Sequence, residues 1–479
     1  MIVGCGAAGL AALVGAAETA ISLGMPLGII ALEASDPGNW GGTSRWSGFH
    51  LRMTETDQIT PNFVEDFLKR SEGKTNESVV RTLAEKAPET IAWISSKGVE
   101  FKKKTENVAG GSTIQPKGYG LAVISALRAE AERLGARILF QTKAVRLALD
   151  GDGAISGVWV SGPRNAKQVK ISCKSVILAT GGFAGSPRLL SKYVGKWAST
   201  LSVTAPGTKM CNGDGIQMAL NIGAKPSGQY DSFQGKPVDA RSRMYDPFLQ
   251  ILHFGIVVNQ KGERFIDEGA PSGEISDFFN YFGKSIARQP KQLAYLIMDQ
   301  KLLSKLYSAP IPHQATLVMS DIPPIHAQSI EELAEIIRVP KKALVKTVST
   351  FNNSATGTAE FNPLTKDGKS TSGVSPPKSN WAVAISRPPF ICYPVKCSVQ
   401  FTFGGLAIDP QARIISSRSG KAIPGLYAAG EIVGLHYNRY LPGAIALNTL
   451  VFGKLAGSNA IEYVQETSKS PGLELVSTV

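Results

Sequence analysis

The first residues contain a glycine pattern that limits how this end of the chain can fold. The segment "IVGCGAAGLAALVGAAETA" reads G-x-G-x-x-G at Gly4, Gly6 and Gly9, after a very short apolar run. In a strand-turn-helix unit, the first glycine permits a tight turn and the second lets the backbone approach a pyrophosphate. The third lets the helix pack close to the strand. The helix then presents free N–H groups to phosphates, so the pattern predicts a dinucleotide-binding βαβ unit.

The next segment supports this interpretation with an acidic residue. The run "LGIIALEAS" predicts a second strand that ends in Glu33, and a carboxylate there is placed to accept hydrogen bonds from a ribose. A glycine-rich βαβ unit without a ligand is the alternative. The run from Met1 to Val3 leaves almost no first strand, so either that strand is short or the native chain begins earlier.

Further glycine motifs indicate FAD rather than NAD. The loop "NWGGTSRWSGFH" follows soon after Glu33. NAD-binding domains have no standard use for such a loop at this place, whereas flavoproteins use one to wrap around the pyrophosphate. Downstream, "KSVILATGGFAG" predicts an apolar strand, and "GLYAAGE" ends in a carboxylate that can meet a second ribose or ribityl hydroxyl. The candidate FAD contacts in the loop are Gly41, Gly42, Thr43, Ser44, Ser47 and Gly48; those elsewhere are Ala8, Ala34, Ala144, Ala179, Thr180, Gly181, Asn212, Asp214, Gly405, Gly430, Glu431, Ala446 and Leu447.

Length, charge and cysteine usage narrow the class of protein. A chain of 479 residues is too long for one compact core, which predicts two domains. The net charge is +13, yet no long basic block occurs, so a basic enzyme, with a funnel for an anionic substrate, is favoured over a nucleic-acid binder. The five cysteines form no CxxC pair, which predicts a cytoplasmic protein without a disulfide framework or metal site. No membrane span is expected.

Taken in this order, the motifs resemble the fumarate reductase / succinate dehydrogenase flavoprotein superfamily, which includes 3-ketosteroid Δ1-dehydrogenases and tricarballylate dehydrogenase-like proteins. The pairing of "VQFTFGGLAID" with "GLYAAGEIVGLHYNRYLPG" is most similar to the tricarballylate dehydrogenase-like branch. The resemblance implies an α/β fold: a Rossmann-type FAD-binding domain, discontinuous in sequence, with an inserted α+β capping domain. The implied ranges are 1–227 and 375–479 for the FAD-binding domain and 228–374 for the cap.

The pattern within the implied cap agrees with this division. The run "ILHFGIVVNQKGERFIDEG" predicts a hairpin with its turn at 259–262. The run "SIEELAEIIRVPKKALVKTVSTFNN" predicts two short helices, the first capped by Ser329 and the second starting at Pro340. The polar run 366–380 predicts a surface loop.

The resemblance also implies a reaction. A hydride moves between flavin N5 and a substrate carbon while an acid or base moves a proton at the neighbouring carbon, so that a C=C bond next to a carbonyl or carboxylate forms or is reduced. We therefore expect an FAD-dependent oxidoreductase with a small-molecule substrate, an unidentified electron acceptor, and no nucleic-acid or membrane partner. The alternatives are a flavin oxidase that uses oxygen and a non-catalytic FAD-binding protein.

Candidate catalytic residues follow from the loop "HYNRYLPG". In fumarate reductases an arginine in this loop clamps a substrate carboxylate, and Tyr440 takes that position here, with Arg439 one residue away. Tyr281 is a further candidate from the cap, whereas His436 and His253 fit a structural role better. The helix after the loop would point N–H groups near Ala446 and Leu447 at the flavin.

Departures from the fumarate reductase pattern bear on the cofactor and the substrate. The two histidines of those enzymes are replaced by Gln400 and Phe401, which disfavours fumarate itself as substrate. Thr43 stands where succinate dehydrogenases carry a histidine bonded to FAD, so non-covalent FAD is expected. The absence of the arginine that clamps a substrate carboxylate favours a ketone or enone as substrate. The net positive charge of the chain and the tricarballylate dehydrogenase-like loop favour a polycarboxylate, and the sequence leaves both substrate classes open.

Overall fold

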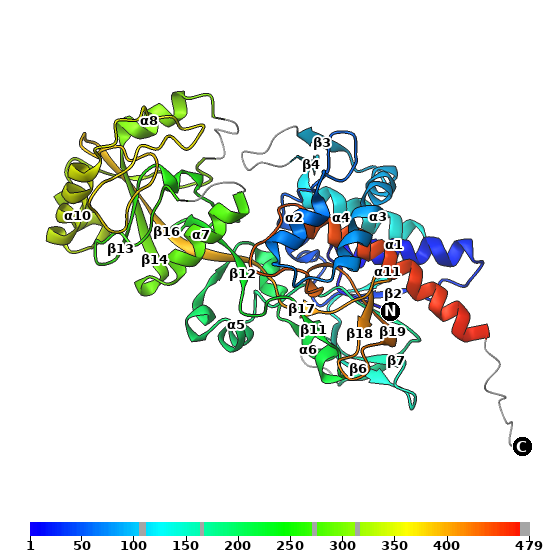
Figure 1. The fold of residues 1–479 in the computed structure, drawn as a ribbon. Helices are drawn as coiled ribbons and strands as arrows, with labels where there is room; N and C mark the ends of the chain where they lie inside the picture. Colours follow the sequence, from blue (N-terminus) through cyan, green and yellow to red (C-terminus); the bar gives the residue numbers. More distant parts are fainter. Residues whose placement is uncertain (105–111, 163–166, 271–274, 312–316, 470–479) are drawn as a thin grey trace, which may run out of the picture.

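The computed structural model describes residues 1–104, 112–162, 167–270, 275–311 and 317–469. Figure 1 shows two bodies side by side, and the N-terminal helix α1 (Ala7–Ser22) and the C-terminal helix α11 (Ala444–Lys469) lie together in one of them. We call this body the FAD-binding unit and the other body the cap.

The FAD-binding unit is built on a six-stranded sheet that both ends of the chain supply. The strand order is β18-β19-β9-β1-β2-β5, and all neighbours are parallel except β18 and β19. The very short β1 lies inside this sheet, where Ile2 pairs with Ala31 on one side and Ile177 on the other. The strands are β1 (Ile2–Val3), β2 (Ile30–Leu32), β5 (Arg137–Leu139), β9 (Val176–Leu178), β18 (Arg413–Ile415) and β19 (Ala422–Ala428).

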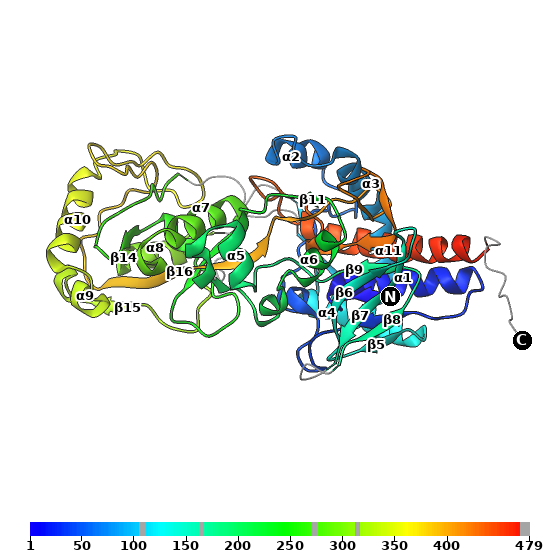
Figure 2. The ribbon, with the colours of Figure 1, turned by 90° about the horizontal axis from the view of Figure 1, so that it is seen from below.

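Small residues let α1 and α11 approach closely. A Cβ added to Gly457 would lie 2.3 Å from the carbonyl oxygen of Ala12, and one added to Gly15 would lie 2.7 Å from that of Lys454. The two helices therefore pack backbone against backbone, as Figure 2 shows from below.

The rest of the FAD-binding unit consists of helices and small sheets around this core. The helices are η1 (Gly42–Trp46), α2 (Phe63–Arg70), α3 (Glu77–Ser96), α4 (Tyr119–Arg133), α5 (Pro187–Tyr193), η3 (Lys196–Thr200), η4 (Pro206–Met210), α6 (Asp214–Asn221) and η8 (Gly430–Ile432). The strands are β3 (Phe101–Lys104), β4 (Thr113–Pro116), β6 (Lys143–Leu149), β7 (Ile155–Ser161), β8 (Val169–Ser172), β11 (Pro226–Ser227) and β17 (Gly405–Leu406).

The cap is built around a second sheet with the strand order β10-β16-β14-β13, in which β12 and β15 also pair with β16. Its strands are β10 (Ser202–Val203), β12 (Phe233–Asp239), β13 (Ile256–Asn259), β14 (Leu293–Asp299), β15 (Ile325–Ala327) and β16 (Phe390–Thr402). Its helices are η5 (Gln250–His253), α7 (Ile275–Ala287), η6 (Pro290–Gln292), α8 (Gln300–Ser308), α9 (Ile330–Ile337) and α10 (Lys341–Ser354).

Strand β16 joins the cores of the two bodies. Ile391, Tyr393 and Val395 belong to the cap core, whereas Phe401 belongs to the core of the FAD-binding unit. The α/β fold is as predicted, while the boundaries at 227 and 375 stay a prediction.

The predicted turn at 259–262 and the predicted helix cap at Ser329 are confirmed, whereas the predicted hairpin and the predicted surface loop are partly wrong. Residues 250–253 of the predicted hairpin form η5, and β13 pairs along its length with β14, meeting the segment after the turn in a bridge between Val258 and Arg264. Gly262 N–H donates to the Asn259 carbonyl at 3.0 Å, which closes the predicted turn, and the Ser329 side chain caps α9. The predicted surface loop 366–380 instead ends in the core. Lys378 is fully buried, and its ammonium donates to the carbonyls of His253 and Gly255, each at 2.6 Å. These two hydrogen bonds offset the cost of burying the ammonium group.

Candidate functional site

The glycine turn has the geometry that its spacing predicts. Gly4 has φ +100°, and a Cβ there would lie 2.5 Å from the Ala179 carbonyl oxygen. A Cβ on Gly9 would lie 1.8 Å from the carbonyl oxygen of Gly4. Gly6 differs, because the nearest atoms to a Cβ there are Ser44 Oγ at 3.6 Å and the Gly41 carbonyl oxygen at 3.7 Å. Packing thus excludes side chains at the first and third glycines, whereas a Cβ at the middle glycine would make only ordinary van der Waals contacts at the start of α1.

The glycine-serine loop faces the start of α1 and forms a second wall beside the glycine turn. Ser44 Oγ accepts a hydrogen bond from Ala7 N–H at 3.2 Å, and Thr43 Oγ1 lies 3.1 Å from Thr208 Oγ1. A Cβ on Gly207 would lie 2.0 Å from the Gly42 carbonyl oxygen. The loop is therefore held between the N-terminus of α1 and helix η4. Farther along the loop, Ser47 Oγ accepts from Phe49 N–H at 2.9 Å, and the Gly48 carbonyl accepts from Gln115 Nε2 at 2.8 Å.

Glu33 lies at the end of β2, beside the turn. Its carboxylate is buried and accepts hydrogen bonds from Cys5 N–H at 3.0 Å, from Ser35 N–H at 2.8 Å and from the Ser35 hydroxyl at 2.7 Å. These donors fix the carboxylate where the sequence places it, while the neighbouring Ala34 is exposed.

A third wall combines the segments after β9 and β19. A Cβ on Gly430, which has φ +83°, would lie 2.9 Å from the Ala8 side chain, so the two ends of the chain meet here. Glu431 Oε1 accepts from Thr402 N–H at 3.0 Å, and burial raises the pKa of this carboxyl to about 7. A Cβ on Gly181 would lie 3.7 Å from Glu431 Oε2. The Thr180 hydroxyl is buried and has no hydrogen-bond partner among the described residues.

Other predicted cofactor contacts are used within the protein. Asp214, in the first turn of α6, pairs with Lys143 Nζ at 2.9 Å, next to the buried Ala144 on β6. Gly405 pairs with Ser227 between β17 and β11, and Leu447 N–H donates to the Gly443 carbonyl at 3.4 Å. Asn212 precedes α6, and Ala446 is buried in the first turn of α11. The roles of all these residues toward FAD stay predictions.

Tyr440 lies where the FAD-binding unit and the cap meet. Its side chain is buried, and its hydroxyl oxygen accepts a hydrogen bond from Gly443 N–H at 2.9 Å. Its ring packs edge-on against Phe401 and His436, with centroid distances of 5.0 and 5.2 Å. Its carbonyl accepts from Arg70 Nη1 at 3.0 Å and, on the cap side, from the hydroxyl of Ser276 at 3.2 Å.

The remaining catalytic candidates have different surroundings. Arg439 is half exposed, with Nη1 3.8 Å from Asp277 Oδ2. Tyr281 donates its hydroxyl to the Asp267 carbonyl at 2.9 Å, so this hydroxyl is directed to the cap backbone. Burial raises the pKa of Tyr281 to about 12. His436 stacks on Phe67 at 5.4 Å, and burial lowers its pKa to about 3, which keeps the imidazole neutral.

A polar stripe on α7 was not predicted from the sequence. Ser276, Asn280 and Lys284 are spaced by four residues and so share one face of this cap helix. Asn280 Oδ1 accepts from Gly235 N–H at 3.0 Å, and Lys284 Nζ donates to the Ser232 hydroxyl at 2.9 Å. Burial lowers the pKa of Lys284 to about 8. The four-residue spacing was the available signal, but the prediction rested on loop motifs.

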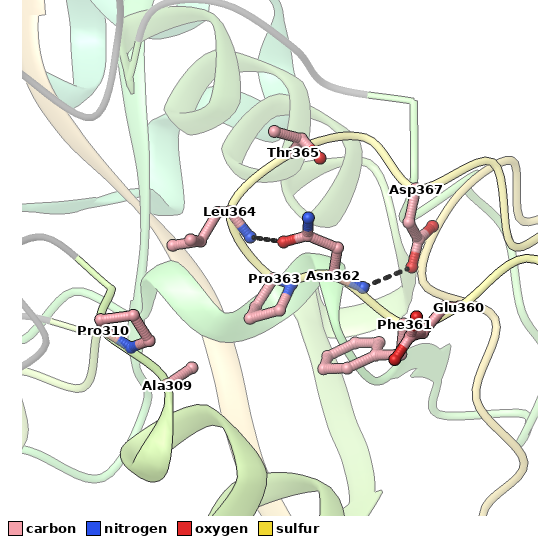
Figure 3. Close-up of a pocket in the computed structure, with 9 residues that line it drawn as sticks. All are labelled: Ala309, Pro310, Glu360, Phe361, Asn362, Pro363, Leu364, Thr365 and Asp367. Atoms are coloured by element: carbon pink, nitrogen blue, oxygen red, sulfur yellow. Dashed lines mark hydrogen bonds between the residues drawn. The ribbon is translucent and has the colours of Figure 1, made fainter.

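The pocket in Figure 3 is a separate feature of the cap. It has a volume of about 530 Å³ and lies between the end of α8 and the segment 360–367. Two hydrogen bonds link its lining residues: Leu364 N–H donates to Asn362 Oδ1 at 2.9 Å, and Asn362 N–H donates to Asp367 Oδ2 at 3.4 Å. The pocket is lined by Ala309, Pro310, Glu360, Phe361, Asn362, Pro363, Leu364, Thr365 and Asp367, none of which belongs to the predicted site.

Residues 1–444 match the family described as "FAD binding domain". The chain belongs to this family. The uncrowded Gly6 at the start of α1, the buried Thr180 hydroxyl without a partner among the described residues and the three walls fit the cofactor, and with the family match the prediction of FAD is confirmed. In the part of the chain that the structure describes, no helix is long and apolar enough to cross a membrane.

Related proteins identify the class of reaction. The chain is 28% identical over 440 residues to the "Probable fumarate reductase" of Shewanella frigidimarina, covering 88% of this chain and 69% of that protein. It is also 28% identical to the NADH:acrylate oxidoreductase of Vibrio harveyi, covering 81% of this chain but only 37% of that much longer protein. The predicted class, an FAD-dependent oxidoreductase acting on C=C or CH–CH bonds, is confirmed by these relatives.

Solved structures agree with the fold. The open conformation of a flavocytochrome c3 fumarate reductase is 25% identical, with a TM-score of 0.76, and covers 96% of this chain and 78% of that chain. The 3-ketosteroid Δ1-dehydrogenase of Sterolibacterium denitrificans is 20% identical, with a TM-score of 0.72, and covers 96% of this chain and 98% of that one. Both structures share the fold of this chain.

Proposed function

We propose that the chain uses FAD to form or reduce a C=C bond adjacent to a carbonyl or carboxylate of a small molecule, with Tyr440 as the residue that carries the proton or hydrogen-bonds the developing oxyanion. The observation that carries this proposal is the position of Tyr440. Its hydroxyl is buried at the junction of the two bodies, with the oxygen fixed by Gly443 N–H.

We assign the cofactor-binding roles from the three walls. Gly6, the start of α1 and the loop from Gly41 to Ser44 would hold the pyrophosphate, and Glu33 the adenosine ribose. Thr180 and Glu431 would meet the ribityl chain, and the N-terminus of α11 would face the flavin. When bound, FAD supplies the hydride donor or acceptor. Thr43 offers no ring nitrogen for a covalent link, so FAD is held without one.

The surroundings of Tyr440 suit proton transfer. Gly443 N–H donates to the phenol oxygen and so fixes the position of the Tyr440 hydroxyl, and a hydroxyl held in place in this way can act as a general acid or hydrogen-bond donor toward a substrate. The rings of Phe401 and His436 cover Tyr440, which excludes water and strengthens its hydrogen bonds. These neutral rings give a carboxylate no counter-charge, whereas Arg439 lies half exposed at the edge of the same loop.

The test is replacement of Tyr440 by phenylalanine, which keeps the ring and removes only the hydroxyl. With a substrate found by screening for flavin bleaching, Tyr440→Phe should reduce flavin about 10²- to 10⁴-fold more slowly while FAD content stays near the wild-type value. The free energy of unfolding should fall by only about 1–3 kcal/mol, because Gly443 N–H loses its acceptor. A wild-type rate in the variant would show that Tyr440 only braces the loop. The search would then move to the cap, starting with Tyr281.

A second variant distinguishes the two substrate classes. Arg439→Ala should raise KM for a polycarboxylate, because a half-exposed cation at the loop edge is lost. It should leave KM for a neutral ketone or enone nearly unchanged. The outcome therefore assigns the substrate class whichever candidate turns over.

The remaining assignments are also proposals. The five cysteines are all free, which supports a reducing compartment such as the cytoplasm. A flavin oxidase differs from a dehydrogenase only in how the reduced flavin is reoxidised, and turnover with and without oxygen separates the two. We infer that the partner is a small molecule and that neither nucleic acid nor a membrane is involved.

A further inference from the structure

We propose that Arg70 is a positioning residue for the Tyr440 loop, and that its ion pair with Asp277 makes the position of that loop depend on whether the cap is docked. The inference rests on the proposed function for the importance of Tyr440. Its structural part, the coupling between the cap and the loop, can be tested without any substrate.

The geometry of Arg70 carries the proposal. Arg70 ends α2 in the FAD-binding unit, and Asp277 lies in the first turn of the cap helix α7. Arg70 Nη1 donates to Asp277 Oδ1 at 3.0 Å and Arg70 Nη2 to Asp277 Oδ2 at 3.3 Å, so both ends of the guanidinium face the carboxylate. The same Nη1 donates to the Tyr440 carbonyl at 3.0 Å. One side chain thus holds the loop and the cap together.

The cap contributes a second contact to the same carbonyl. The Ser276 hydroxyl donates to the Tyr440 carbonyl at 3.2 Å, next to Asp277 in the chain. The Tyr440 carbonyl therefore lies between a donor from each body. Figure 1 shows α7 on the side of the cap that faces the FAD-binding unit. Movement of α7 away from that unit would withdraw Ser276 and Asp277 together, because they occupy the same helical turn.

The loop is also tied to Arg70 one residue earlier. Arg439 N–H donates to the Arg70 carbonyl at 3.3 Å, and Arg439 Nη1 lies 3.8 Å from Asp277 Oδ2. Asp277 thus faces two arginines, and its place in the first turn of α7 is favoured by the helix dipole. Loss of the carboxylate would leave both cations without this counter-charge and would loosen residues 439 and 440 together.

The ion pair has the features of a strong contact. Exposed ion pairs contribute little to stability. The Arg70 and Asp277 side chains are only 14% and 19% exposed, and they form a bidentate pair with two parallel hydrogen bonds. Charge-assisted hydrogen bonds of this kind shift an equilibrium by about tenfold or more, so their loss should raise the undocked population by about that factor.

Hydrogen–deuterium exchange of the FAD-loaded protein tests the coupling. Asp277→Asn keeps the side-chain shape but removes the charge, and Arg70→Lys keeps the charge but loses the fork. We expect each variant to raise the exchange rate of peptides covering residues 436–443 by about tenfold, although Asp277 belongs to the other body. The double variant should add little, because both substitutions break the same contact. Arg413→Ala, which removes a pair with Asp409 elsewhere in the FAD-binding unit, is the matched control.

A second readout follows the access of solvent to the flavin. Iodide should quench the fluorescence of bound FAD more strongly in Asp277→Asn and Arg70→Lys than in the wild type and in Arg413→Ala. With a good substrate, kcat should fall in the two variants while FAD content stays the same.

Two outcomes would overturn the proposal. Wild-type exchange of residues 436–443 in both variants would show that the ion pair does not hold the loop. A rise confined to α7 would show a local effect without coupling. Either result leaves the Tyr440→Phe experiment unaffected, so a failure here is distinct from a failure of the proposed reaction.

Discussion

At the scale of single residues, steric and hydrogen-bonding demands explain which predictions could be made. Gly4 and Gly9 are recognisable in the sequence because carbonyl oxygens lie where their side chains would be. Glu33 is recognisable because the end of a second strand is a fixed place relative to the turn. Arg70 and Asp277 are 207 residues apart, and no local pattern links them. Such pairs form only when the tertiary structure brings their helices together.

Glu33 carries a prediction at this scale. Glu33→Gln keeps the shape of the side chain but removes the charge that a ribose hydroxyl would meet. Hydrogen bonds to a charged group contribute about 1.5–3 kcal/mol, so the affinity for FAD should fall by about ten- to a hundredfold. Titration of the deflavinated protein with FAD measures the effect.

The control for this titration is Glu100→Gln, which removes an exposed carboxylate that pairs with Lys117 at the surface. Its FAD affinity should equal that of the wild type. An unchanged affinity in Glu33→Gln itself would mean that the ribose is held by other residues.

At the scale of elements, the sequence predicted the strands and helices beside its motifs and two helices of the cap, but it missed what some of them contact. The helices α9 and α10 follow from capping and proline signals, which act within a few residues. The polar loop 366–380 was misjudged because composition alone does not show that the ammonium of Lys378 bonds two carbonyls in the core. A buried lysine with two acceptors and an exposed lysine look the same in a sequence.

The contact between α1 and α11 carries the prediction at this scale. Glycine to alanine inside a helix normally stabilises it by about 1 kcal/mol. At Gly457 the added methyl group would lie 2.3 Å from the Ala12 carbonyl oxygen and 2.7 Å from Ala16 N. Gly457→Ala should therefore destabilise the protein by roughly 1–3 kcal/mol, the usual cost of overpacking.

Urea unfolding measures this change, and its sign is diagnostic. Glu462→Ala, at an exposed position of the same helix, should leave stability within about 0.5 kcal/mol of the wild type. A more stable Gly457→Ala variant would show that α1 and α11 can separate to admit the methyl group.

At the scale of the whole molecule, the split FAD-binding unit was predicted from the family that the motifs resemble. The sheet order, with β19 from the end of the chain beside β9 and β1, agrees with that expectation. The way the cap docks could not be predicted in the same way. It depends on contacts of Arg70, Ser276 and Asp277 across the two bodies, and these residues match no motif.

The last prediction concerns the response of the folded protein to acid. His253 is buried in the cap among Phe254, Phe278 and Trp381, and burial, followed by the nearby Lys378 charge, lowers its pKa from 6.5 to about 3. As the pH falls below about 6.5, the unfolded chain binds a proton at this residue and the folded protein does not. The stability associated with neutral His253 is therefore present above the unfolded pKa and is lost progressively as the pH falls toward 3.

One proton of difference changes the free energy of unfolding by about 1.4 kcal/mol per pH unit. Between about pH 7.5 and pH 5.5, the wild type should therefore lose about 1 kcal/mol more stability than His253→Gln, whose side chain does not titrate. Buried His436 acts in the same direction, and Glu431, with its raised pKa, acts in the opposite direction. Both groups are present in the two proteins, so the comparison isolates His253. Equal pH dependence of urea unfolding in the two proteins would show that His253 gains a proton in the folded cap, through water that reaches its ring.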